Sequence, residues 1–279
     1  MIAVEDPRLV FARQTLGPVS AVSMPGLPPH LLALVDVHDI HYVVKRHTDS
    51  GRFRQETHAY ITVGPHLRDR APRMVATDPG TRSLLLTFLP GLGAADLPPG
   101  TSAERDVHRS AGATLRALHQ VVPGNPGDGI SAFLAERIRL WVGRARVAGL
   151  ISAPERRTLL ACADALAVTA MDSAICHLDY QPRNWLVGSD GRVHVLDFEH
   201  ARLDARIRDF ARLEHRHWRS NPHLRQAFFD GYGRSLDEPE HDLLTRFGVI
   251  EALTALVRGY QSGDLRLAAH GRTLLDQLF

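Results

Sequence analysis

The sequence predicts an α+β protein with a small N-terminal antiparallel sheet and a larger, mainly helical C-terminal part. Three observations support this fold class. Short apolar runs separated by Pro, Gly and Asp dominate the chain up to residue 90, and a Pro/Gly/Ala-rich stretch follows at 90–100. From Thr101 onward, apolar residues recur at helical spacing. We therefore expect an N-terminal lobe at 1–90 and a C-terminal lobe at 91–279.

The N-terminal pattern favours strands from about residue 8 to residue 90. One helix is expected at 51–70, because Phe53, Thr57, Tyr60 and Ile61 recur at spacings of three or four. Period-two runs and the breakers between them define the strands. The expected strands are 19–22, 31–37, 40–45 and 84–89.

The C-terminal pattern is helical, with one interruption. Thr101 with Glu104, and Ser152 with Glu155, have capping-box spacing and start two of the helices. A loop is expected at 123–127, and two short strands should be joined by the turn 188–191. The expected segments are helices at 101–118, 131–148 and 152–170, strands at 184–187 and 193–196, and helices starting near 205, 222, 237 and 265.

Composition bounds the class of protein. The chain has 279 residues, of which 44% are hydrophobic and 23% charged, as in ordinary globular proteins. Two cysteines cannot form a disulfide framework, no signal peptide is evident, and no apolar run approaches the roughly 18 residues of a membrane span. We expect a cytoplasmic protein. A net charge of +2 with dispersed arginines indicates neither a nucleic acid nor a membrane as partner.

The segment from His177 to Asn184, followed by Asp197 and Glu199, carries the strongest functional signal. Phosphoryl transfer needs one group that orients the attacking hydroxyl and others that hold magnesium. Asp179 can accept a hydroxyl proton, whereas Asn184 and the acidic pair offer hard oxygen ligands. The segment therefore predicts a site that transfers phosphate from a nucleotide.

Lys45 is the only lysine among 33 basic residues, and it lies in an apolar, β-branched run. A compact ammonium can grip phosphate oxygens, a geometry that a planar guanidinium does not reproduce. Glu56, on the helix expected at 51–70, could pair with it. Two alternatives stay open: an arginine-biased genome could leave one lysine anywhere, and Glu56 could be a solvated helix carboxylate.

These residues resemble the aminoglycoside phosphotransferase and choline kinase family, small-molecule kinases with a protein-kinase-like, two-lobed fold. The resemblance spans nearly the whole chain. The family pattern of His, any residue, Asp, four residues, Asn, and later Asp, any residue, Asp or Glu is matched in order. The matching residues are His177, Asp179, Asn184, Asp197 and Glu199.

The resemblance implies roles for these residues. Asp179 would be the catalytic base or align the hydroxyl, and His177 and Asp209 would support its loop. ATP, or GTP, would be the donor, with Mg²⁺ as cofactor. The implied magnesium ligands are Asn184, Asp197 and Glu199, and the implied nucleotide contacts are Lys45, Glu56, Thr87, Phe88 and Leu89.

One segment departs from the family. The phosphates are usually covered by a hairpin of small residues, but residues 17–30 are rich in proline and poor in glycine. We expect a short or distorted hairpin in which Ser20, Ser23 or backbone donors meet the phosphates.

The acceptor would lie below the catalytic loop, beside the region that follows Glu199, which is strongly basic. A polycationic aminoglycoside would need carboxylates there. We therefore expect a neutral or weakly charged hydroxylated molecule, either an antibiotic, such as a nucleoside in a resistance or self-resistance role, or a metabolite of the choline, sugar or amino-alcohol type. Tryptophans are usually core residues, but Trp218 joins the candidate contacts. These are Arg183, Arg202, Glu214, His215 and Trp218.

Two other classes of protein are compatible with part of this pattern. A non-catalytic kinase-like nucleotide-binding protein would be expected to lack one of Lys45, Asp179, Asn184 or Asp197, and this chain has all four. A protein kinase would need a longer peptide-binding segment between Glu199 and Asp209. Histidine pairs such as His215 and His217 lack the partners of a zinc site.

Overall fold

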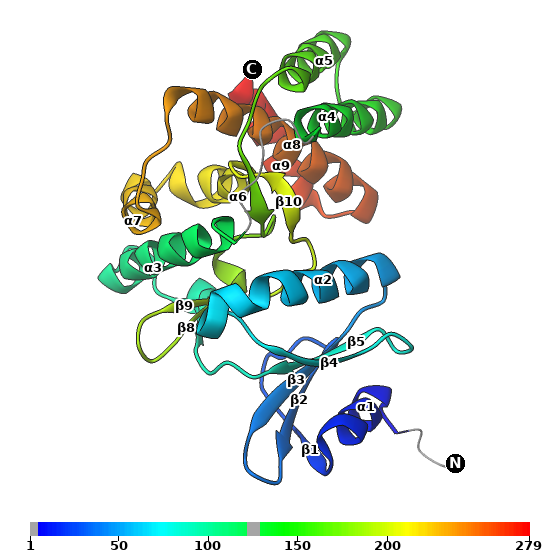
Figure 1. The fold of residues 1–279 in the computed structure, drawn as a ribbon. Helices are drawn as coiled ribbons and strands as arrows, with labels where there is room; N and C mark the ends of the chain where they lie inside the picture. The colour runs from blue at the N-terminus through cyan, green and yellow to red at the C-terminus, as the bar shows by residue number, and fades with distance from the viewer. Residues whose placement is uncertain (1–4, 122–128) are drawn as a thin grey trace.

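The protein is described here from a computed structural model, which covers residues 5–121 and 129–279 (Figure 1). The loop expected at 123–127 lies outside the described residues. A small N-terminal lobe built on an antiparallel sheet adjoins a larger helical C-terminal lobe, as the sequence predicts.

The N-terminal sheet has five antiparallel strands in the order β1-β2-β3-β5-β4. Four of them were predicted. β4 was not, because a bulge between Met74 and Ala76 interrupts the alternation that marks a strand. The strands are β1 (Val19–Val22), β2 (Leu31–Asp36), β3 (His41–Arg46), β4 (Met74–Asp78) and β5 (Ser83–Thr87).

Two helices, α1 (Pro7–Leu16) and α2 (Ser50–Leu67), cover opposite faces of this sheet. Leu85 of β5 packs with Phe11 of α1, whereas its neighbours Leu84 and Leu86 pack with the apolar residues of α2. Side chains alternate between the two faces of a strand, so α1 and α2 pack against different sets of side chains from the same strands. α2 lies on the side of the C-terminal lobe (Figure 1).

The expectation of strands from about residue 8 was wrong for α1. Its apolar residues run consecutively from Leu9 to Ala12 and give no helical period. The signals that identify the helix lie at its ends. The Asp6 side chain accepts the Arg8 N–H, Pro7 occupies the first turn, and Gly17 ends the helix at φ +83°.

Beyond β5 the chain crosses to the helical lobe through a small sheet of three strands. β6 (Leu92–Gly93) pairs with β8 (Trp185–Val187), which pairs with β9 (Val193–Val195) in the predicted hairpin. Asn184 closes a short helical turn instead of starting the strand. The short turns are η1 (Arg68–Arg70), η2 (Ala94–Asp96) and η3 (Pro182–Asn184).

The helical lobe follows the predicted order. Ser152 forms a complete capping box, whereas Thr101 caps its helix alone and the Glu104 side chain accepts the Gly100 N–H. Two strands were missed: β7 (Ser173–Cys176) pairs antiparallel with β10 (Arg202–Ala205). The helices are α3 (Ser102–His119), α4 (Ile130–Val147), α5 (Ala153–Ala167), α6 (Arg208–Leu213), α7 (Pro222–Tyr232), α8 (Glu238–Ser262) and α9 (Leu265–Leu278).

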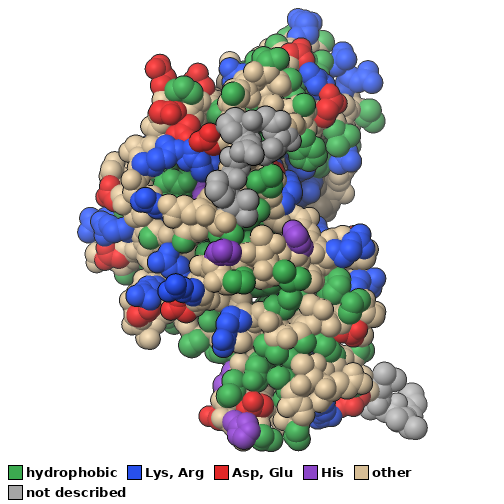
Figure 2. All heavy atoms as spheres, viewed as in Figure 1, with side chains coloured by type: hydrophobic (Ala, Val, Ile, Leu, Met, Phe, Trp, Pro, Cys, Tyr) green, Lys and Arg blue, Asp and Glu red, His purple; other side chains and the backbone are tan. Residues whose placement is uncertain are grey.

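One apolar cluster runs from α2 through the helical lobe, and Trp185 and Trp218 are among its most buried members. On the face seen in Figure 2, basic side chains are interspersed with acidic ones. None of the helices within residues 5–121 and 129–279 is long and apolar enough to cross a membrane.

Candidate active site

Asp209, at the start of α6, fixes the backbone of the loop that follows β7. Its buried carboxylate accepts the N–H groups of His177 at 2.8 Å and Leu178 at 2.5 Å, and lies 3.0 Å from His119 Nε2. Burial opposes the ionised form, but the hydrogen bond from His119 and the other donors lower the pKa of Asp209. Leu178 adopts φ +63°, which a non-glycine residue rarely does. The anchored N–H groups hold this strained turn.

His177 is fully buried and braces the loop. Its Nδ1 atom accepts the Asp179 N–H at 3.2 Å, so Nε2 carries the hydrogen and donates it to the Leu196 carbonyl at 2.9 Å. Burial lowers the pKa of His177. Both ring nitrogens are therefore committed to backbone groups of a neutral imidazole.

Asp179 is 2% exposed, and its carboxylate is oriented by several donors. Gln181 Nε2 lies 2.5 Å from Oδ1, and Asn184 Nδ2 lies 3.0 Å from Oδ2. Two guanidinium groups also pair with it. Arg183 Nη2 lies 2.6 Å from Oδ2, and Arg212, from α6, contacts Oδ1. These four groups thus hold the Asp179 carboxylate in one orientation.

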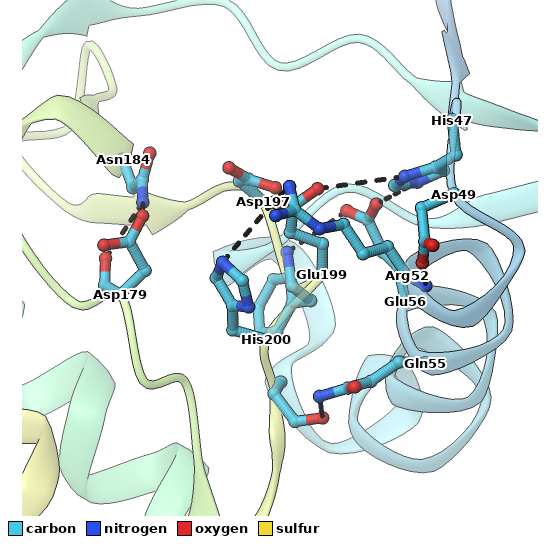
Figure 3. A network of polar contacts seen from close by, with 12 residues as sticks. His47, Asp49, Arg52, Gln55, Glu56, Asp179, Asn184, Asp197, Glu199 and His200 are labelled. Atoms are coloured by element: carbon cyan, nitrogen blue, oxygen red, sulfur yellow. Dashed lines mark hydrogen bonds and ion pairs between the residues drawn. The ribbon is translucent and has the colours of Figure 1, made fainter. Parts of the chain in front are cut away.

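Asn184 and Asp197, both of the C-terminal lobe, lie beside each other at the cleft between the lobes, because the Leu196 N–H donates to the Asn184 carbonyl at 2.9 Å. Asn184 donates its amide hydrogens to Asp179, which directs the amide oxygen away from that residue (Figure 3). Asp197 lies between Asn184 and the residues of α2, and its side chain is 35% exposed. The amide oxygen and the second carboxylate oxygen are the hard donors of this cleft.

Lys45, on β3, meets a carboxylate from each side. Its Nζ atom lies 2.7 Å from Glu56 Oε2 and 2.5 Å from Asp197 Oδ1. The sheet register explains the meeting, because Lys45 pairs with Leu84, whose side chain packs on the α2 face. Burial works to lower the pKa of Lys45, but Glu56 and Asp197 raise it above its ordinary value. The ammonium therefore stays charged.

Glu56 is fully buried, so the alternative of a solvated helix carboxylate is wrong. Besides Lys45, it contacts His47 Nε2 at 2.7 Å, and its Oε1 atom accepts the Phe198 N–H at 3.1 Å. A carboxylate on α2 is thereby tied to both β3 and the segment after β9. This connection fixes the two lobes against each other at the cleft.

Glu199 is turned toward α2 (Figure 3). Its Oε1 atom lies 2.9 Å from Arg52 Nη1 and 3.4 Å from His200 Nε2, and Oε2 lies 4.0 Å from Lys45 Nζ. It lies beside the Lys45 cluster, on the side away from Asp179.

Two of the expected nucleotide contacts, at the end of β5 and directly after it, use their backbone N–H groups within the protein. The Thr87 N–H donates to the Arg73 carbonyl at 2.9 Å, and the Phe88 N–H donates to the His41 carbonyl at 3.2 Å. Leu89, the third expected contact, is the next residue along the chain. Ser23 is exposed in the connection 23–30 between β1 and β2.

A cavity of about 210 Å³ lies below the loop, where Leu178 and Tyr180 form part of its wall. Of the candidate acceptor contacts, Arg202 lines this cavity and Arg183 contacts Asp179. The lining is strongly basic. Its arginines are Arg137, Arg202, Arg208, Arg212 and Arg258.

Glu214, His215 and Trp218 do not line the cavity, which corrects their choice as acceptor contacts. α6 continues as a π-helix from Glu214 to Trp218, and this turn directs them toward α7 and α8. Glu214 pairs with Arg225, the His215 ring lies against Gly248, and Trp218 packs on Phe228. Trp218 is 1% exposed and belongs to the core.

Sequence reasoning missed several cavity residues. Arg137 comes from α4, and Glu251, Thr254 and Arg258 come from α8. No local spacing connects these positions, because only the packing of distant helices brings them together. The sole signal was the general basic character of the region after Glu199.

Comparisons with known proteins identify the family and the fold. Residues 32–244 match the model of the phosphotransferase enzyme family. Choline kinase LicA from Streptococcus pneumoniae has a similar structure, with a TM-score of 0.68 at 12% identity over 96% of this chain and 97% of that chain. No curated protein sequence matches the chain significantly.

Two antibiotic phosphotransferases are similar to the same extent. Macrolide 2'-phosphotransferase MphH from Brachybacterium faecium has a TM-score of 0.65 at 17% identity, over 96% of each chain. The streptomycin-ATP-APH(2")-IIa ternary complex has a TM-score of 0.65 at 15% identity, over 99% of this chain and 97% of that chain. At these identities the likeness establishes a shared fold, the two-lobed fold of small-molecule kinases.

Proposed function

This chain belongs to the phosphotransferase enzyme family, and from that membership we propose that it transfers the γ-phosphate of ATP to a hydroxyl group of a small molecule. The observation that carries the proposal is the convergence of Lys45, Asp197, Asn184 and Asp179 on one cleft. A nucleotide site and a hydroxyl-orienting carboxylate lie at its two sides.

In the proposed reaction, Asp179 aligns the acceptor hydroxyl. The hydroxyl oxygen attacks the γ-phosphorus, the bond from phosphorus to the bridging oxygen breaks, ADP leaves, and the hydroxyl proton passes to Asp179. The transition state is loose, so positioning and charge neutralisation supply most of the catalysis. The donors around the Asp179 carboxylate serve this positioning, and His177 and Asp209 hold the backbone beneath it.

Lys45 would bind the phosphates of ATP, with Glu56 holding the ammonium in the cleft. Glu56 is buried and also contacts His47 and the Phe198 N–H. It would therefore keep Lys45 in place if the Asp197 carboxylate bound a metal ion instead of the ammonium. Thr87 and Phe88 use their N–H groups within the protein, which favours the Leu89 backbone for the adenine edge. Ser23 is exposed in the β1–β2 connection and is our candidate to cover the phosphates. The streptomycin-ATP complex of a similar fold supports ATP as the donor.

The donor set of the cleft fits magnesium. The Asn184 amide oxygen is turned away from Asp179, and Asp197 offers its second carboxylate oxygen, so two hard oxygen ligands are available. Glu199 is the candidate for a second ion, after exchange of its contact with Arg52. Magnesium would neutralise charge on the nucleotide phosphates.

The acceptor would be a small hydroxylated molecule bound in the cavity beside Asp179. Five arginines line that cavity, which disfavours a polycationic aminoglycoside. A nucleoside or other non-polycationic antibiotic is our first choice, supported by the fold shared with a macrolide phosphotransferase. A small metabolite is the second, supported by the fold shared with a choline kinase.

The proposal is tested by incubating the protein with MgATP and a panel of nucleoside, macrolide and aminoglycoside antibiotics, choline, sugars and amino alcohols. We expect one non-polycationic acceptor to gain the mass of a single phosphoryl group, and the gain to need both magnesium and ATP. Transfer to aminoglycosides alone would contradict the choice of acceptor.

A non-catalytic nucleotide-binding protein is the alternative. The presence and convergence of all four key side chains argue against it. Tight ATP binding with no transfer to any acceptor would favour this alternative.

A further inference from the structure

The basic cavity beside Asp179 contains more positive charge than its own carboxylates neutralise. Arg202 and Arg208 share Asp204. Arg212 pairs with Asp179 and lies 3.6 Å from Glu251, which also pairs with Arg216 outside the cavity. Each of these three arginines of the lining therefore has a carboxylate partner.

The two remaining arginines of the lining are not compensated. Arg137, on α4, and Arg258, on α8, form no ion pair within 4.0 Å among the residues that the structure describes. Arg137 is half-buried, whereas Arg258 is exposed and lies over the ring of Trp141 at 5.7 Å. The cavity wall thus includes two guanidinium groups without a carboxylate partner among the described residues, from the packed helices α4 and α8.

Two polar atoms of this wall are buried without a hydrogen-bond partner among the described residues. They are Nε of Arg137 and Oγ1 of Thr254. Burial, with the charges of Arg208, Arg202 and Arg258, lowers the pKa of Arg137 to about 10. A buried donor without a partner, in a field of like charge, is costly, and an anionic ligand would remove both costs.

We propose that the acceptor carries an anionic oxygen group, a carboxylate or a phosphate ester, which Arg137 and Arg258 bind while its hydroxyl lies at Asp179. This inference rests on the proposed phosphotransferase function and specifies its substrate class. Guanidinium groups bind carboxylates and phosphates through paired hydrogen bonds. The Thr254 hydroxyl supplies one further donor.

The composition of the cavity wall supports this assignment. Leu178 and Tyr180, the neighbours of Asp179, form one part of the wall, and Arg212 both lines the cavity and contacts Asp179. Arg137 and Arg258 come from other elements of that wall. A single polyol with a charged end could therefore present a hydroxyl at one side and its anionic group at the other.

The test uses three open-chain polyols that differ in one terminal group. Gluconate has a carboxylate, sorbitol a hydroxymethyl group and glucamine an ammonium. Their dissociation constants are measured by isothermal titration calorimetry on the full chain, with magnesium and a non-hydrolysable ATP analogue present. Sorbitol 6-phosphate is added to decide between carboxylate and phosphate as the preferred group.

We expect gluconate or sorbitol 6-phosphate to bind at least about tenfold more tightly than sorbitol, and glucamine most weakly. The double variant Arg137→Gln/Arg258→Gln should lose that advantage. Arg144→Gln is the matched control, because Arg144 lies on the same helix and over the same Trp141 ring but does not line the cavity.

Two results would overturn the inference: anionic polyols that bind no better than sorbitol, or an advantage that survives in the double variant. Failure of the nucleotide analogue itself to bind would instead count against the proposed function. The two failures are therefore distinguishable.

Discussion

The Nζ atom of Lys45 lies 2.5 Å from Oδ1 of Asp197, although the two residues are 152 positions apart. The contact joins a central strand of the N-terminal sheet to the segment that follows β9. Glu56 lies on the other side of the ammonium at 2.7 Å. The cleft therefore contains a cation held between two carboxylates, one of which, Asp197, is the proposed magnesium ligand.

Lys45→Met is expected to lower kcat/KM for ATP by roughly 100-fold, because a positioned cation that stabilises phosphate charge is lost. Lys45→Arg should restore little of it, since a planar guanidinium presents its donors in a geometry different from that of the compact ammonium between Glu56 and Asp197. Steady-state kinetics measure both. Arg46→Met, at the next and exposed position of β3, is the control, and full activity of Lys45→Arg would contradict the role of the ammonium.

Asp179→Asn is expected to reduce kcat by at least about 100-fold while ATP affinity changes little. The amide cannot accept the hydroxyl proton, whereas the proposed phosphate-binding residue Lys45 contacts Glu56 and Asp197 instead of Asp179. Calorimetry of ATP binding accompanies the rate measurement. Asp190→Asn, in the exposed turn between β8 and β9, should behave as the unmodified protein. Equal loss of binding and rate would assign Asp179 to the nucleotide site.

The two arginines that contact Asp179 should differ in effect. Arg183 is 63% exposed, whereas the side chain of Arg212 is 25% exposed, so solvent and salt screen the first pair more strongly. We expect Arg212→Gln to lower kcat by roughly tenfold and Arg183→Gln by less than about threefold. Rates measured at low and high salt for each variant test this, and the reverse order would show that the exposed arginine positions the carboxylate.

Asp209→Asn is expected to destabilise the fold by about 3 kcal/mol, because the buried carboxylate accepts two backbone N–H groups and a histidine hydrogen. An amide would direct its own NH₂ group at one of these donors. Urea denaturation gives the change in the free energy of unfolding. Asp242→Asn, exposed on α8, serves as control, and a loss below about 1 kcal/mol would mean that Asp209 is not a support of the loop.

His217 should make stability depend on pH. Burial, with the nearby His108 and Arg216, lowers the pKa of His217 from its ordinary 6.5 to about 4. Between these values the unfolded chain binds more protons at this residue than the folded chain does, so its contribution to stability is complete above pH 6.5 and lost as pH falls toward 4.

The corresponding experiment compares urea unfolding at pH 7 and pH 5 for the protein and for His217→Gln. The variant should lose roughly 1 kcal/mol less between the two pH values, after allowance for solvent screening of the partly exposed ring. An identical loss in both proteins would remove His217 as a source of the pH dependence.

The cleft was largely predictable because its chemistry lies in a compact stretch of sequence. His177, Asp179 and Asn184 share one loop, and Asp197 follows one hairpin later, so spacing alone indicates that they meet. Lys45 was recognisable by residue type. Its partner Glu56 was uncertain until the strand register brought Lys45 to the α2 face.

The acceptor cavity was not predictable to the same extent. Its arginines come from α4, β10, α6 and α8, and the orientation of each depends on how distant helices pack. The π-helix at 214–218 carries Trp218 into the core, although a basic stretch of sequence suggested a binding surface. β7 and β10 were missed because each is short and its pairing partner lies far along the chain.

The unique lysine also makes the cleft chemically addressable. The 6% exposed Lys45 carries the only side-chain amine of the chain, so an amine-acylating reagent has a single side-chain target, located between the lobes. The arginine side chains on the surface would not react with such a reagent. Peptide mass spectrometry after brief acylation would therefore report the opening and closing of the cleft at one residue, without a tag or an engineered probe.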